Sequence, residues 1–199
     1  MIYPYLADYI KKNKVPQHPE ELGWLLDQVK KLNPKIILEI GVQNGGTSIC
    51  WLDILPDDGL LIGVDIIQKR PHMEGLDENY KFKFILKDSN STNCYNKVIN
   101  ILVNKYIDFL FIDGSHDYYQ IKKDYELYKH LVRSGGIIAF HDIYMQPKNI
   151  SIDQLNLSDG WNGSVTRFWK ELLLENKVKT DEFQADKDFN IGIGVIFNE

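Results

Sequence analysis

The sequence predicts an α/β fold with one mostly parallel sheet of seven strands, helices on both faces and a terminal antiparallel hairpin. Three observations predict it. Short runs rich in β-branched and aromatic residues alternate with longer amphipathic stretches. The run IDFLFI at 107–112 is almost continuously apolar, as expected for a strand covered by helices on both faces. The last two apolar runs are joined by a link too short for a crossover helix, which indicates a hairpin.

The elements follow in a regular order along the chain. Pro19 begins a helix, because proline fits the first helical position, and Glu20 and Glu21 favour the positive end of that helix. Its apolar stripe continues at helical spacing to Leu32. Further helices are expected near residues 47–55, 93–106, 118–132 and 165–176, the third of these four ended by the glycines of the segment 133–136. Strands are expected at residues 35–39, 60–66, 82–87, 107–112, 137–141, 178–183 and 191–197.

The length of 199 residues fits a single domain. We expect residues 1–34 to form a helical segment that packs on the core, and residues 35–199 to form the domain itself. Tyr3, Tyr5, Leu6 and Tyr9 give the N-terminus an apolar stripe, which fits packing on the domain or against another copy in a homo-oligomer. Only Cys50 and Cys94 are present, so a disulfide framework is not indicated.

The charge balance limits the classes of partner. The chain carries 23 Lys+Arg against 28 Asp+Glu, a net charge of −5, which disfavours a nucleic-acid partner. No apolar run approaches the roughly 18 residues of a membrane span, and the N-terminus lacks a signal-peptide core. We therefore expect a soluble, cytoplasmic protein with no membrane partner.

A glycine turn follows the first predicted strand, in the segment EIGVQNGGTS at 39–48. Glycines at this place let a backbone approach a ligand closely, and the helix start offers free N–H groups. Position 43 is Gln, so the dinucleotide fingerprint G-x-G-x-x-G fails, which counts against a nicotinamide-dependent oxidoreductase. Asp65 ends the second strand, where an acid can accept hydrogen bonds from both ribose hydroxyls. The alternative is an ordinary turn and a solvated strand-end acid.

Four polar side chains follow two neighbouring predicted strands. The fourth strand runs into Asp113 and His116, and the fifth into His141 and Asp142. They should converge at one sheet edge, beside the crevice that the glycine turn and Asp65 border. Two carboxylates and an imidazole suit Mg²⁺, Mn²⁺ or another divalent ion. The alternative is that these residues only cap strand ends and order a turn.

Two segments carry a resemblance to a known family. The pattern E-x-G-x-x-x-G at 39–45 resembles the first motif of class I S-adenosylmethionine-dependent methyltransferases. The stretch LFIDGSHDYYQIKKDYELYKHLVRSGGIIAFHDI, residues 110–143, resembles small-molecule O-methyltransferases of the macrocin O-methyltransferase and cephalosporin-hydroxylase-like group. The similarity extends from about Leu22 over nearly the whole remaining chain. It implies a Rossmann-like class I methyltransferase fold, in which the last strand enters the sheet antiparallel.

The resemblance also implies a set of site residues. S-adenosyl-L-methionine would be held by Glu39, Gly41, Gly45, Asp65, Asp88 and Asp113, with Glu39 orienting the amino group and Asp88 near the adenine. Metal-dependent relatives use the residues that match Asp113, His141 and Asp142 as ligands, although His141 stands where those relatives carry an acid. Lys87 is a second departure, at a position where relatives usually carry glycine.

The implied activity is metal-assisted O-methylation of a small hydroxylated metabolite, such as a sugar or glycosylated natural product. His116 stands at the spacing of a catalytic lysine in catechol-type relatives, which makes it the first candidate for the base and His141 the second. Asp117 would cap the following helix or orient His116, and capping is favoured. A nicotinamide-dependent oxidoreductase and a non-catalytic S-adenosylmethionine-binding domain are the alternatives. The loops at 68–80 and 144–162 should select the acceptor.

Overall fold

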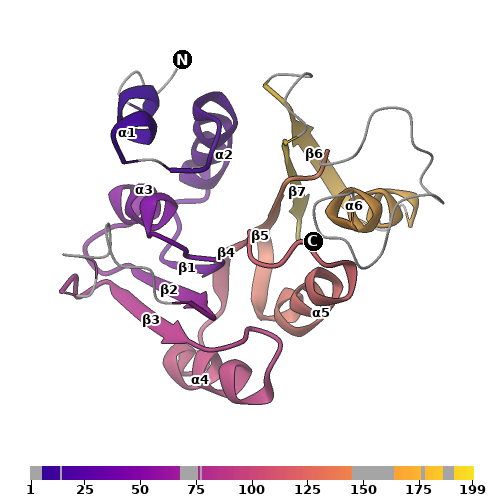
Figure 1. The fold of residues 1–199 in the computed structure, drawn as a ribbon. Coiled ribbons are helices and arrows are strands. Elements are labelled where there is room, and N and C mark those ends of the chain that lie inside the picture. Colours follow the sequence, from indigo (N-terminus) through magenta and orange to yellow (C-terminus); the bar gives the residue numbers. More distant parts are fainter. Residues whose placement is uncertain are drawn as a thin grey trace.

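The computed structural model describes residues 6–13, 15–67, 76, 78–144, 164–175, 178–185 and 191–199. Its strands form one seven-stranded sheet in the order β3-β2-β1-β4-β5-β7-β6 (Figure 1). The strands are β1 (Ile36–Ile40), β2 (Leu60–Asp65), β3 (Phe82–Leu86), β4 (Ile107–Ile112), β5 (Val132–His141), β6 (Lys179–Phe183) and β7 (Ile193–Phe197). The helices are α1 (Leu6–Asn13), α2 (Pro19–Lys31), α3 (Gly46–Ile54), α4 (Thr92–Leu102), α5 (Tyr118–Tyr128) and α6 (Ser164–Leu174), with a 3₁₀ turn, η1 (Lys129–Leu131), after α5.

The pairing pattern confirms the predicted sheet. β1 pairs in parallel with β2 and β4, and β3 and β5 extend the parallel part on either side. β7 pairs antiparallel with both β5 and β6, so the last two strands form the expected hairpin. All strands from β1 to β5 therefore present their carboxyl ends at one edge of the sheet, which is where the polar strand-end residues lie.

The fifth strand begins earlier than predicted. Helix α5 ends at Tyr128, and β5 already starts at Val132, so Gly135 and Gly136 lie within the strand and do not end the helix. The pairing of β5 with β4 shifts register here, which identifies a bulge. Gly135 has a φ of +73°, and a Cβ on Gly136 would lie 2.9 Å from the carbonyl oxygen of Asp108. The two glycines therefore serve the bulge and the close strand approach.

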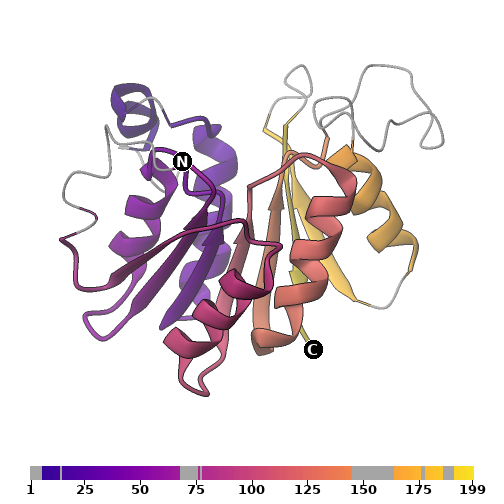
Figure 2. The ribbon, with the colours of Figure 1, turned by 60° about the horizontal axis from the view of Figure 1, so that its bottom comes forward.

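Helices cover both faces of the sheet, as predicted (Figures 1 and 2). One buried cluster joins apolar side chains of α1, α2 and α3 to one face, with Trp51 of α3 packed against Phe109 and Phe111 of β4. The other cluster joins α4, α5 and α6 to the opposite face, with Phe168 of α6 against Phe140 of β5. Cys50 and Cys94 are both buried and free.

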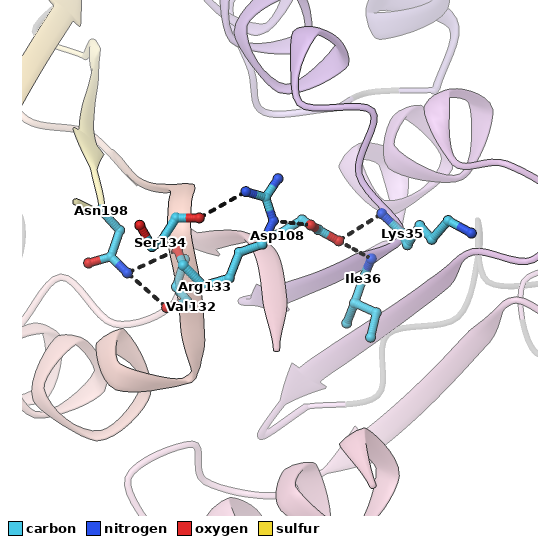
Figure 3. A network of polar contacts seen from close by, with 7 residues as sticks. All are labelled: Lys35, Ile36, Asp108, Val132, Arg133, Ser134 and Asn198. Carbon is cyan, nitrogen blue, oxygen red and sulfur yellow. Dashed lines mark hydrogen bonds and ion pairs between the residues drawn. The ribbon is translucent and has the colours of Figure 1, made fainter. Parts of the chain in front are cut away.

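A polar network closes the edge of the sheet where β1, β4 and β5 begin (Figure 3). The carboxylate of Asp108 accepts hydrogen bonds from the backbone N–H groups of Lys35 and Ile36, each at 2.8 Å, and from Nε of Arg133 at 2.5 Å. Asn198, just after β7, donates its side-chain amide to two carbonyls at the start of β5. These contacts fix the starts of three parallel strands and thereby the relative positions of their carboxyl ends.

Several sequence-based expectations concern residues outside the described ranges. Tyr3 and Tyr5 lie there, as does most of the two loops expected to select the acceptor. Tyr9 is described, and its hydroxyl donates to the carbonyl oxygen of Gly46 at 3.0 Å, so it packs on this chain's own domain. Among the described helices, none has the length and apolar character needed to cross a membrane.

Candidate functional site

A cavity of about 880 Å³ opens at the carboxyl ends of the parallel strands. Its lining comes from the glycine turn after β1, the ends of β2 to β5, the start of α5 and the connection between α1 and α2. Its size is that of a small-molecule or cofactor site. Gly41, Asp65, Asp88, Asp113, His116, His141 and Asp142 all line it. The structure thus brings together seven of the nine predicted site residues in one cavity.

The glycine turn forms the floor of this cavity. Gly41 has a φ of +95°, and a Cβ there would overlap the backbone carbonyl oxygen of Asp113. Only glycine therefore lets the β1 and β4 ends approach so closely. Gly45 has a φ of +77° and caps helix α3, which places the free N–H groups of that helix start near the cavity. Gly45 itself shapes the turn and is not among the lining residues.

Glu39 is not among the residues that line the cavity, and its expected role in orienting the amino group of the cofactor, directly or through water, stays a prediction. Its side chain is completely buried in β1, and Oε2 accepts a hydrogen bond from the hydroxyl of Ser48 in α3. Burial raises the pKa of Glu39 to about 8, although the hydrogen bond from Ser48 opposes this. In this structure Glu39 ties the strand to the helix that follows the glycine turn.

Two strand-end acids line the wall next to the glycine turn. Asp65 accepts a hydrogen bond from the backbone N–H of Gln43 on Oδ2 at 2.7 Å and one from Ile67 on Oδ1 at 2.8 Å. These bonds hold its carboxylate in place, and each oxygen retains a further lone pair for a ligand hydroxyl. Asp88 is exposed after β3, with Oδ1 accepting from the backbone N–H of Asn90 at 2.9 Å. Both acids are therefore presented to the cavity in fixed orientations.

Sequence reasoning missed a buried pair beside Asp88. Asn90 lines the cavity, and its amide nitrogen donates to Oδ1 of Asp124 at 2.7 Å. Asp124 is 1% exposed on α5, and burial raises the pKa of its carboxyl to about 7. Because the amide nitrogen of Asn90 faces α5, its amide oxygen faces away from that helix. No local pattern indicates this pair, because it depends on how α5 packs beside the end of β3.

The polar strand ends of β4 and β5 meet on the opposite side of the glycine turn. Nδ1 of His141 lies 3.4 Å from Oδ1 of Asp113 and 3.1 Å from Oδ2 of Asp142. Nε2 of His116 lies 2.9 Å from the same Oδ2 of Asp142. Asp142 has a φ of +63°, a left-handed conformation that turns its carboxylate toward the two imidazoles. The four predicted residues therefore form one connected cluster.

Burial and charge act in opposite directions within this cluster. Burial disfavours the charged form of His141, but the carboxylates of Asp113 and Asp142 outweigh it and hold the pKa of His141 well above its ordinary value. Burial likewise opposes ionisation of Asp142, yet its hydrogen bonds with His116 and His141 lower the pKa of that carboxyl below its usual range. Asp142 is thus an ionised carboxylate that lies between two imidazoles.

The donor set fits a divalent cation. Asp113, His141 and Asp142 each offer one ligand atom, and these atoms lie within 4.8 Å of one another. Nε2 of His141 is buried and has no hydrogen-bond partner within the described part of the chain. Two carboxylates and one imidazole are acceptable ligands for Mg²⁺ or Mn²⁺, provided that the imidazole gives up its proton. The residues present therefore match an ion of this class in chemistry and proximity.

Asp117 and His116 have separate partners. The side chain of Asp117 caps α5 by accepting from the backbone N–H groups of Tyr119 and Gln120, which confirms the capping role. The residue placed to orient His116 is Asp142, and this could not be read from spacing alone.

The N-terminal segment also reaches the site, which sequence reasoning missed. Val15, Pro16 and Gln17, between α1 and α2, line the cavity. Nε2 of Gln17 donates to Oδ2 of Asp113 at 2.6 Å. The partners stand 96 residues apart in the chain, so no local pattern indicates the contact.

Comparisons with known proteins identify related sequences and folds. A family described as "Methyltransferase domain" matches residues 38–143, just over half of the chain. A protein of Dictyostelium discoideum described as "Probable caffeoyl-CoA O-methyltransferase 3" is 34% identical over 118 residues, which are 58% of this chain and 46% of that protein. The chain spans about half the length of the first curated relatives that it matches.

Two solved structures show the same fold. The O-methyltransferase TomG from Streptomyces achromogenes, in complex with SAM, has a TM-score of 0.69 at 16% identity, covering 97% of this chain and 87% of its own. The MycE methyltransferase, in complex with Mg, SAH and mycinamycin VI, has a TM-score of 0.67 at 16% identity, covering 98% of this chain and 55% of its own. The Rossmann-like methyltransferase fold expected from the resemblance is therefore confirmed.

Proposed function

Because this chain belongs to the methyltransferase domain family, we propose that it transfers the methyl group of S-adenosylmethionine to a hydroxyl group of a small molecule. The observation that carries the proposal is a single cavity with two chemically different ends. One end has the glycine turn and the acids that follow β2 and β3, and the other has the cluster that follows β4 and β5. The names of the relatives, which are O-methyltransferases, support the same reaction.

The cofactor would lie across the strand ends. Asp65 would accept hydrogen bonds from the ribose hydroxyls. The wall formed by Asp88 and Asn90 would face the adenine ring. The amino-acid end would lie beside Gly41 and Asp113, which both line the cavity. Glu39 and Gly45 do not line the cavity, and they would act by holding the glycine turn in its conformation.

A divalent ion would be held by Asp113, His141 and Asp142. When bound, such an ion lowers the pKa of a hydroxyl that it contacts and orients it. Mg in the MycE complex, which shares this fold, supports that assignment. The ring of His141 is enclosed by the two carboxylates, with a side chain only 4% exposed, so a ligand role suits it better than proton transfer to an acceptor.

His116 would take the proton from the acceptor. It lines the cavity, and its side chain is 18% exposed compared with 7% for Asp142. Asp142 accepts the Nε2–H of His116, which fixes the tautomer in which Nδ1 carries the lone pair. The hydroxyl proton would pass to His116, and the oxygen would attack the methyl carbon of S-adenosylmethionine as the carbon–sulfur bond breaks in line. The products would be a methylated acceptor and neutral S-adenosylhomocysteine.

The acceptor class is a sugar or a glycosylated natural product, carried over from the resemblance, and MycE in complex with mycinamycin VI supports it. A nicotinamide-dependent oxidoreductase is not favoured, because Gln43 replaces the second glycine of the dinucleotide fingerprint and the sheet ends in an antiparallel hairpin.

Replacing Asp65 by alanine should weaken binding of S-adenosylhomocysteine by roughly ten-fold or more, as measured by calorimetry. The reason is the loss of hydrogen bonds to a charged acceptor, each worth about 1.5–3 kcal/mol. Asp58→Ala is the matched control, since this exposed acid near the other end of β2 pairs only with Lys35 among the described residues. Its affinity should equal that of the wild type. Unchanged affinity of Asp65→Ala would remove the ribose assignment.

A further inference from the structure

Gln17, in the connection between α1 and α2, bonds to the polar cluster. It is 6% exposed, and its amide nitrogen donates to Oδ2 of Asp113 at 2.6 Å. Its own carbonyl oxygen is buried without a hydrogen-bond partner in the described structure. A donor to a carboxylate makes a stronger hydrogen bond than one to a neutral acceptor, so this contact constrains Asp113.

The backbone is anchored both before and after Gln17. On one side, Val15 packs against the glycine turn, since a Cβ on Gly46 would lie 2.5 Å from Cγ2 of Val15, and its backbone N–H donates to Ile10 at 3.1 Å. On the other side, α2 begins at Pro19 and is anchored by buried leucines. The connection therefore presents the Gln17 amide to the cavity from a fixed backbone.

The hydrogen bond from Gln17 gives the two carboxylate oxygens of Asp113 different partners. Oδ2 is held by Gln17, whereas Oδ1 faces Nδ1 of His141 at 3.4 Å. Without the amide, the carboxylate could rotate about its bond to Cβ and turn either oxygen, or both, toward the histidine. With the amide in place, Oδ1 is the oxygen directed to the space shared with His141 and Asp142.

We propose that Gln17 is a positioning residue for Asp113, which holds Oδ2 so that Oδ1 is presented as a single-oxygen ligand to a divalent cation. This inference rests on the proposed metal assistance, and it assigns a part of the metal site to the N-terminal segment. Residues that hydrogen-bond to metal ligands commonly set the affinity for the ion through the orientation of those ligands.

The test is binding of Mn²⁺ alone to the full chain, measured by the electron paramagnetic resonance signal of the free ion. Gln17→Met keeps a side chain of similar volume but removes the donor, so we expect affinity for Mn²⁺ to fall by roughly 10-fold to 100-fold. Gln28→Met, on α2 and outside the cavity lining, is the matched control and should bind as the wild type does. Thermal midpoints of all variants would show that they are folded.

Two further readouts separate positioning from a merely structural role. The spectrum of the bound Mn²⁺ should change in Gln17→Met, because the ligand geometry changes. Gln17→Asn, which retains an amide donor on a shorter stem, should recover part of the lost affinity. If the wild type binds Mn²⁺ and Gln17→Met binds it equally with the same spectrum, the positioning role is wrong while the metal site stands. If the wild type binds no Mn²⁺, both the metal assistance and this inference are wrong.

Discussion

Replacing His116 by glutamine should lower kcat by roughly 100-fold to 10,000-fold, the range typical for loss of a general base. Affinity for S-adenosylmethionine should remain within a few-fold of the wild type, since the loss falls on the transition state. Glutamine keeps a polar side chain of similar length near Asp142 but cannot take a proton at neutral pH. His130→Gln is the matched control, because His130 contacts Tyr95 away from the cavity.

The dependence on divalent ion adds a second readout for His116. His116→Gln should keep the dependence on Mn²⁺ of the wild type. His141→Gln should instead weaken the affinity for the divalent ion and be partly rescued by excess Mn²⁺. If the two variants showed the opposite phenotypes, the roles of His116 and His141 would have to be exchanged.

Removal of divalent ions should abolish turnover. After dialysis against EDTA the enzyme should lose its activity, and addition of Mg²⁺ or Mn²⁺ should restore it, because an ion on the acceptor hydroxyl lowers the pKa of that hydroxyl. Initial rates with and without added ion measure the effect. Affinity for S-adenosylhomocysteine, measured on the same samples, should change far less than turnover.

Variants of the cluster separate metal assistance from catalysis by the base alone. Asp142 contacts His116 as well as His141, so its removal would affect both mechanisms. Asp113 bonds to Gln17 and lies beside His141, so Asp113→Asn tests the ion site while Asp142, the partner of His116, stays in place. Full activity in EDTA, together with an active Asp113→Asn variant, would contradict the metal site and leave the base mechanism in place.

The fold could be predicted because its signals are local. Apolar strands, the glycine turn and the short link before the last strand each lie within a few residues, and the resemblance supplied their order in the sheet. β5 starts five residues before its predicted start (137 − 132), because Gly135 and Gly136 are also typical of a helix end. Glycines serve helix ends and strand bulges alike, and only the pairing with β4 distinguishes the two.

The candidate site could be predicted where strand ends bring residues together. Asp113, His116, His141 and Asp142 follow neighbouring parallel strands, so their convergence follows from topology. The contact of Gln17 with Asp113 depends on how a distant segment packs, and no local pattern carries it. The buried position of Glu39 and the pairing of Asn90 with Asp124 depend in the same way on helix packing.

Calorimetric titration of the full chain with S-adenosylmethionine, and separately with NAD⁺, tests the central claim most directly. The cavity with its glycine turn and with Asp65 is expected to bind S-adenosylmethionine at one site per chain, in competition with S-adenosylhomocysteine, and to give no saturable heat with NAD⁺. Saturable binding of NAD⁺ without binding of S-adenosylmethionine would contradict the account.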